Sequence, residues 1–111
     1  MNVAWTGIDA DVDEDGYLLQ VADWTPAIAQ QLAERQGLQL NAEHWAVIEA
    51  IRRFYQHYQR SPTTRVLLKY LAQELGPTQA GSIYLMSLFG DGTPAKTIAR
   101  IAGLPKPANC I

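Results

Sequence analysis

Residues 41–58, with the sequence NAEHWAVIEAIRRFYQHY, decide the fold that we expect for this chain. The segment opens on Asn41, a residue type that favours the N-cap of a helix. Apolar and aromatic residues then recur at steps of three and four and form one stripe: His44, Ile48, Ile51, Tyr55 and Tyr58, with Trp45 beside it. This spacing predicts a helix with one buried face, and we interpret the stripe as core and not as a cofactor site.

Start and stop signals on either side predict four more helices. Two Thr-Pro pairs, at 25–26 and 93–94, combine a capping hydroxyl with a proline suited to the first helical turn. Glycines at 37 and 103 are typical helix stops. Between them, Ser61-Pro62, Gly76-Pro77 and Gly90-Asp91-Gly92 separate the helical segments. We therefore expect helices at about 26–36, 42–60, 64–75, 79–89 and 94–102. In the third helix the residues expected to face inward are Val66, Leu67, Tyr70 and Leu71.

The N-terminal region differs from the rest in composition. Residues 2–8 are β-prone, residues 9–15 are acidic and rich in turn formers, and Tyr17-Leu18-Leu19 follows Gly16. This pattern predicts a small β-hairpin. We expect one mostly α domain over 1–111, a compact bundle of about five short helices. The N-terminal β-hairpin lies within 1–20, the helical body is 25–102, and a flexible C-terminal arm covers 103–111.

The arm carries the single cysteine of the chain, Cys110. Pro105 and Pro107 remove backbone donors and favour extended conformations, and Gly103 stops the preceding helix. An extended segment of this kind would place Cys110 up to roughly 20 Å beyond the last helix. The alternative is a frayed terminus with an incidental thiol.

Length and composition set further limits. The chain has 111 residues and one cysteine, which excludes a disulfide framework and a cysteine-based zinc site. It has no apolar run long enough to span a membrane and no N-terminal leader pattern. We therefore expect a cytoplasmic protein, in a compartment that keeps the thiol reduced.

Charge is distributed unevenly along the chain. Residues 1–51 hold nine acidic residues against Arg35, a balance of −8, whereas residues 52–111 hold eight basic residues against two acidic ones, a balance of +6. The pattern indicates an acidic or nucleic-acid partner for the C-terminal half, or simply attraction between the halves within the fold. A phosphate-contacting patch, or a solvated face, is formed by Arg52, Arg53, Arg60, Arg65 and Lys69.

Cys110 is the one strong candidate nucleophile. The nearby carboxylate of Ile111 is expected to raise the pKa of the Cys110 thiol, whereas Lys106 and Arg100 would lower it if the arm folds over them. His44 and His57 lie thirteen positions apart on one predicted helix and are not a metal pair, and His44 fits a capping or core role. The sequence has no motif for a metal, nucleotide or other cofactor.

The chain resembles the TusE/DsrC family over nearly its whole length. The motifs that carry the resemblance are Asp13-Glu14-Asp15-Gly16-Tyr17-Leu18 before Trp24, His44-Trp45 with Val47-Ile48, Tyr84-Leu85 with Leu88-Phe89, and Ile101-Ala102-Gly103-Leu104-Pro105-Lys106-Pro107 before Cys110. The resemblance implies a small helical sulfurtransferase that carries sulfur as a persulfide on Cys110. Supporting roles would fall to Arg100 and Lys106, which neutralise the anion, and to Gly103, Pro105 and Pro107, which set the stiffness of the arm.

The family divides, and one position separates its branches. Members that serve dissimilatory sulfite reductase carry a second cysteine eleven positions before the last, where this chain has Ala99. The chain therefore resembles the TusE branch. This implies a TusBCD-like donor complex, an MnmA-like tRNA-thiolating enzyme as acceptor, an indirect contact with tRNA, and a role in 2-thiolation of the wobble uridine.

Two alternatives stay open at the level of sequence. One is a single-cysteine DsrC-like protein in another sulfur pathway. The other is a DNA-binding regulator that uses the second and third helices as a helix-turn-helix pair. The identity of the partners, the oligomeric state and the order of the arm are not determined by the sequence.

Overall fold

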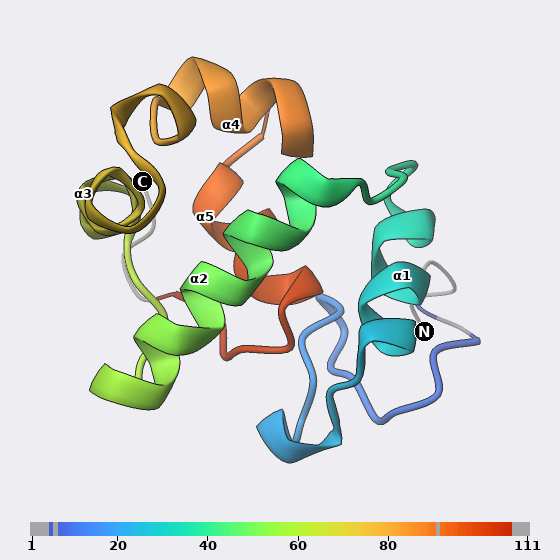
Figure 1. The fold of residues 1–111 in the computed structure, drawn as a ribbon. Coiled ribbons are helices and arrows are strands. Elements are labelled where there is room, and N and C mark those ends of the chain that lie inside the picture. The colour runs from blue at the N-terminus through green and yellow to red at the C-terminus, as the bar shows by residue number, and fades with distance from the viewer. Residues whose placement is uncertain (1–4, 6, 91, 108–111) are drawn as a thin grey trace.

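Five α-helices and two short 3-10 helices make up the regular structure of the described residues, which are 5, 7–90 and 92–107 of a computed structural model (Figure 1). In chain order the elements are η2 (Val21–Asp23), α1 (Pro26–Arg35), α2 (Ala42–Tyr58), α3 (Thr64–Leu75), η3 (Pro77–Gln79), α4 (Ser82–Phe89) and α5 (Pro94–Ile101). The five predicted helices are thus confirmed. None of them is both long and apolar enough to cross a membrane.

A side-chain cap marks the start of α1 and α2, whereas the N-caps of α3, α4 and α5 form no side-chain cap hydrogen bond, which the Thr93 hydroxyl was predicted to form. The Thr25 hydroxyl accepts a hydrogen bond from the Ile28 amide at 3.2 Å, and Pro26 takes the first helical position as predicted. The fourth helix begins three residues later than expected, at Ser82 and not at Gln79, because η3 takes up the residues after Gly76.

The core lies around α5, which contacts each of the other four helices and is covered in Figure 1 by α2. The large side chains without solvent exposure come from every helix and include Leu32, Ile48, Ile51, Leu67, Leu71, Leu85, Ile98 and Ile101. Two residues predicted to face inward are exposed, Tyr58 at 51% and Val66 at 43%. Tyr58 lies in the last turn of α2, and the aromatic residue buried near this end of the helix is Phe54, one turn earlier. Val66 lies beside the buried face of α3, which Leu67 and Leu71 define.

His44 has the capping and core role predicted for it. Its Nδ1 accepts a hydrogen bond from the Asn41 amide at 3.1 Å, while the Asn41 side chain accepts from the His44 amide, which completes a capping box. Its Nε2 lies 2.6 Å from the carbonyl oxygen of Leu88 at the end of α4. The buried imidazole therefore connects the start of α2 to the end of α4.

The predicted N-terminal β-hairpin is not supported by the described residues, which contain no strand. In the described part of this region the strand-like pairing is a single antiparallel bridge between Val12 and Leu18. The Asp13 carboxylate accepts hydrogen bonds from the amides of Asp15 and Tyr17, at 2.9 and 3.0 Å, and closes a tight turn.

Burial explains why this pairing does not extend into strands. Tyr17 and Leu18 are adjacent in sequence, yet both are buried, whereas a strand sends successive side chains to opposite faces. The first strand was predicted over residues 2–8, of which residues 2–4 and 6 lie outside the described part of the chain.

Candidate functional site: the seat of the C-terminal segment

The residues predicted to support Cys110 begin where α5 ends. Gly103 has a φ of +73°, its amide donates to the Arg100 carbonyl at 3.1 Å, and the Leu104 amide donates to the Ala99 carbonyl at 2.9 Å. These bonds form a Schellman motif, in which a left-handed glycine reverses the chain and the next apolar residue packs back on the helix. Leu104 is accordingly only 1% exposed. The chain turns back onto the body directly after α5.

Trp24 and Arg52 hold this turn from outside. The Trp24 indole Nε1 donates to the Ile101 carbonyl at 2.9 Å, and Arg52 Nη1 donates to the Ala102 carbonyl at 2.6 Å. The Arg52 guanidinium also lies over the Trp24 ring, 3.9 Å from its centroid. Burial lowers the pKa of Arg52 from its ordinary value. Because a Cβ on Gly103 would collide with the Trp24 ring, the position is open only to glycine.

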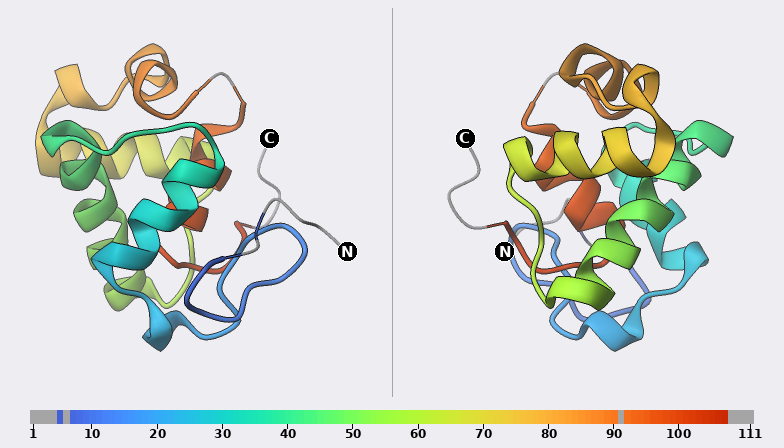
Figure 2. Two further views of the ribbon diagram at one scale, coloured as in Figure 1. Left: turned by 90° about the vertical axis from the view of Figure 1, so that its right-hand side faces the viewer. Right: turned by 60° about the vertical axis from the view of Figure 1, so that its left-hand side comes forward.

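The segment beyond the turn follows the linker between α2 and α3. The Ser61 hydroxyl, on that linker, donates to the Pro105 carbonyl at 2.5 Å. Pro105 itself is exposed, whereas Pro107 is buried. Figure 2 shows the segment after α5, in red, passing beneath the helices toward this linker. We refer to residues 103–107 as the C-terminal segment.

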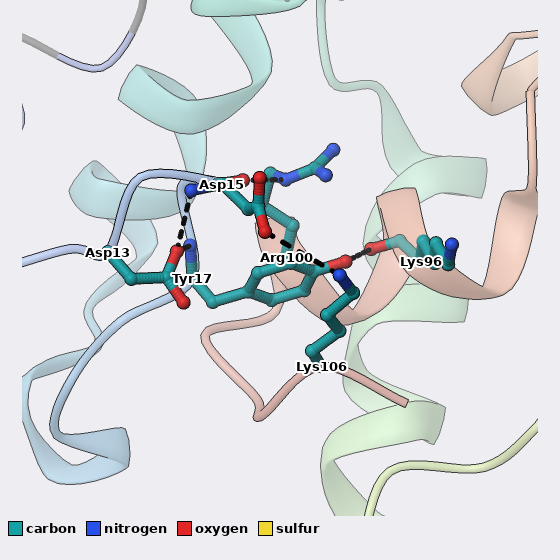
Figure 3. A network of polar contacts seen from close by, with 6 residues as sticks. All are labelled: Asp13, Asp15, Tyr17, Lys96, Arg100 and Lys106. Atoms are coloured by element: carbon teal, nitrogen blue, oxygen red, sulfur yellow. Dashed lines mark hydrogen bonds and ion pairs between the residues drawn. The ribbon is translucent and has the colours of Figure 1, made fainter. Parts of the chain in front are cut away.

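Two basic residues of the site meet the acidic N-terminal turn (Figure 3). Arg100 donates to the Asp15 carbonyl at 2.7 Å through Nε and to the Gln36 side chain at 2.8 Å through Nη1. Lys106 Nζ lies 3.5 Å from the Asp15 carboxylate, and both side chains are 51% exposed. An ion pair this exposed holds the segment only weakly. The Arg100 guanidinium lies 4.9 Å from the centroid of the buried Tyr17 ring.

This geometry corrects the predicted arm. An arm was expected to extend away from Gly103, but residues 103–107 lie against the body because Leu104 and Pro107 are buried there. Cys110 and its neighbours, residues 108–111, lie outside the described part of the chain. The five predicted supporting residues do lie together in one region, which the C-terminal segment and the last turn of α5 form.

The residues that hold the segment in place were not predicted from the sequence. Trp24, Arg52 and Ser61 are 77, 50 and 44 positions away from their partners, so no local pattern signals their roles. The burial of Leu104, in contrast, is indicated by the sequence, because an apolar residue directly after a helix-ending glycine commonly packs back on the helix.

The described residues also limit the chemistry. They contain no group of three His, Cys, Asp or Glu side chains placed to hold a metal ion. Ala99, at the position of the second cysteine in one branch of the resembled family, is fully buried in α5. The chain has a single thiol, and it follows the seated segment by three residues.

The chain is similar to known proteins over nearly its whole length. The family model described as "DsrC like protein" matches residues 4–111. The chain is 43% identical to "Sulfurtransferase TusE" of Sodalis glossinidius, with 96% of this chain and 98% of that protein covered. It is 44% identical to the "Sulfurtransferase TusE homolog" of Haemophilus influenzae, with 95% of each chain covered.

Solved structures share the fold. The solution structure of DsrC from Allochromatium vinosum superimposes with a TM-score of 0.81 at 46% identity, covering 90% of this chain and 88% of that one. The crystal structure of the oxidized γ-subunit of the dissimilatory sulfite reductase (DsrC) from Archaeoglobus fulgidus gives 0.76 at 36% identity, covering 92% of each. With a family match over almost every residue, the chain belongs to the DsrC-like family.

Proposed function

We propose that this protein is a sulfur carrier that accepts persulfide sulfur on Cys110 and relays it to a partner. The observation that carries the proposal is the near full-length match to relatives named sulfurtransferase TusE. Cys110 is the one thiol of the chain, and residues 103–107 before it are seated on the body. The carrier acts stoichiometrically with its partners, in the reducing cytoplasm, and needs no cofactor for this chemistry.

The proposed transfer is a thiolate exchange. The Cys110 thiolate attacks the terminal sulfur of a donor persulfide, R–S–SH, and forms Cys110–S–SH while the donor leaves as the thiolate R–S⁻. The carrier then passes that terminal sulfur to the thiolate of the next cysteine and returns to its original state. No external oxidant or reductant is needed in either step, because each sulfur–sulfur bond broken is replaced by one formed.

The seat of the C-terminal segment determines how the sulfur is presented. Cys110 follows the buried Pro107 by three residues, so the chain between them spans at most about 10 Å. Gly103 permits the turn, and Pro105 and Pro107 keep the segment extended. Lys106 is half-exposed and only weakly paired with Asp15, which leaves its ammonium accessible to an anionic persulfide. Arg100 contributes positive charge from the last turn of α5.

We further propose that the pathway served is 2-thiolation of the tRNA wobble uridine, with a TusBCD-like donor complex and an MnmA-like acceptor enzyme. This chain cannot form a disulfide or trisulfide between two of its own cysteines, because the position of the second cysteine, eleven before Cys110, is the buried Ala99. The single thiol and the TusE-named relatives support this assignment over service to a sulfite reductase.

The test is intact-mass spectrometry after incubation with a persulfide donor protein. The wild-type chain is expected to gain the mass of one sulfur atom, which reduction removes, and Cys110→Ser is expected to gain nothing while keeping its helical circular dichroism. A matched control moves the thiol: Gln30→Cys in the Cys110→Ser background places it on an exposed position of α1. We expect this variant to fail in delivery to the acceptor.

Two outcomes would contradict the proposal. Sulfur bound to the Cys110→Ser protein would remove Cys110 from the mechanism, and equal delivery by the relocated thiol would remove the role of the seated segment. A reconstituted mixture of donor, carrier and acceptor tests the pathway. If the protein serves tRNA thiolation, the mixture should form 2-thiouridine. If it serves another sulfur pathway, Cys110 should still be loaded with sulfur, but no 2-thiouridine should form.

A further inference from the structure

A groove of about 480 Å³ lies between the last turns of α2 and the exposed side of α3. Its walls include the aromatic residues Phe54, Tyr58 and Tyr70, together with the cationic residues Arg60 and Lys69. Ser61, which donates to the Pro105 carbonyl, also lines it. The groove therefore adjoins the C-terminal segment, and apart from Ser61 the residues named here have no part in the proposed sulfur relay.

The aromatic residues form a cluster of tilted and edge-to-face contacts, in which Tyr58 is the most exposed ring. Phe54 lies 4.6 Å from Tyr58 and 5.1 Å from Tyr70, measured between ring centroids. Phe54 is buried, whereas Tyr58 is 51% exposed. Phe54 thus supports the Tyr58 ring from within, and much of the Tyr58 ring remains in contact with solvent. A rigid, exposed aromatic ring of this kind is a surface on which another flat ring can stack.

The charges of the groove are positive. Arg60 and Lys69 are exposed, and among the described residues neither forms an ion pair. The described lining contains no carboxylate. Glu74, further along α3, is paired with Arg53 at 3.2 Å. The groove thus offers two unneutralised cations next to an exposed aromatic ring.

We propose that this groove binds single-stranded RNA, with phosphates on Arg60 and Lys69 and an unpaired base stacked on Tyr58. Cations beside a stacking platform are the combination that single-stranded nucleic acids use. An acidic protein would engage the cations without needing the ring, and a duplex keeps its bases stacked inside. The purpose of the site rests on the proposed function, because it would hold an RNA substrate beside the C-terminal segment that leads to Cys110. The binding itself does not depend on sulfur.

The test is fluorescence anisotropy with a short, labelled, unstructured RNA and the full chain, over a series of salt concentrations. For Arg60→Gln/Lys69→Gln we expect an affinity loss of tenfold or more. The negative slope of log affinity against log salt concentration should become shallower by about 1.4, since two phosphate contacts are removed. For Tyr58→Leu we expect a loss of about fivefold or more at an unchanged slope, and Tyr58→Phe should bind like the wild type.

The matched control is Arg35→Gln/Lys96→Gln, which makes the same change in net charge away from the groove. It should weaken binding much less than the groove variant. Cys110→Ser should bind RNA like the wild type, so failure of the carrier function and failure of this site are separable.

Four results would overturn the proposal: no detectable RNA binding, equal loss in the control variant, tighter binding of duplex DNA, or displacement of the RNA by polyglutamate with no effect of Tyr58→Leu. The third would indicate the DNA-binding alternative, and the fourth an acidic protein surface.

Discussion

The C-termini of α1 and α5 share one capping motif but have different roles. Gly37 and Gly103 have φ angles of +75° and +73°, and each is followed by a leucine whose amide bonds back to the helix. Around Gly37 a Cβ would meet nothing within 4 Å, whereas at Gly103 it would meet the Trp24 ring. Leu38 is half-buried and Leu104 is fully buried.

The two helix ends differ in which of their features have a local cause and which have a tertiary one. A glycine and a leucine are enough to end a helix with this backbone, and they do so at both sites. Only at α5 do residues from η2–α1, α2 and the α2–α3 linker close over the turn, and this packing makes the end of α5 an anchor for the residues that follow.

The largest effect is expected from placing alanine at each glycine. Gly103→Ala should lower the free energy of unfolding by about 2–4 kcal/mol, since a left-handed alanine is strained and its Cβ would displace Trp24. Gly37→Ala has only the backbone strain and should lose about 1 kcal/mol. Urea unfolding followed by circular dichroism measures both. Equal losses would show that Trp24 does not constrain the anchor.

The next effect comes from Trp24. Trp24→Phe removes the indole N–H that the Ile101 carbonyl accepts, and should lower the free energy of unfolding by about 1–2 kcal/mol. Trp24→Ala combined with Gly103→Ala should lose less than the sum of the two single changes, because the collision partner is gone. An additive double variant, measured in the same urea experiment, would contradict the geometry of the turn.

A smaller effect is expected at the linker. Ser61→Ala removes the donor to the Pro105 carbonyl and should cost about 1 kcal/mol, with faster amide hydrogen exchange at Leu104. Ser87→Ala is the control, because the exposed Ser87 hydroxyl donates to the Tyr84 carbonyl within α4 and makes no bond to the C-terminal segment. Unchanged exchange in Ser61→Ala would mean that the linker does not hold the segment.

The smallest effect belongs to the salt bridge. Lys106→Gln should change the free energy of unfolding by less than about 0.5 kcal/mol, since both partners are half-exposed. Any difference from the wild type should vanish as salt is added. A large, salt-independent loss would show that Lys106 holds the segment more firmly than its exposure indicates.

Much of the fold was readable from short-range signals. The Thr-Pro pairs at 25–26 and 93–94 mark helix starts and the glycines at 37 and 103 mark helix ends, because these signals act between neighbouring residues; the threonine hydroxyl caps its helix only at Thr25. The hairpin prediction failed because Asp13 satisfies two amides locally, which a count of β-prone residues does not register.

The site was only partly readable for a related reason. The residues predicted to support Cys110 are neighbours in sequence, so the sequence alone was enough to propose them, and their supporting role stays a prediction. Their partners are not local: Trp24 meets Ile101 across 77 positions, and Ser61 meets Pro105 across 44. Whether an extended tail projects or packs depends on such partners, and a proline-rich sequence alone is compatible with both.

The burial of Leu104 and Pro107 has a consequence for how deep an acceptor cysteine can lie in a partner protein. If Cys110 carries the sulfur as proposed, three residues of chain beyond a seated Pro107 span at most about 10 Å, so a shallow acceptor would be served without rearrangement. An acceptor at the bottom of a longer channel requires the segment to detach, which breaks the Ser61–Pro105 bond and exposes Leu104 to water. Channel depth would then select among receiving enzymes, because each further residue released adds to the activation barrier for handover.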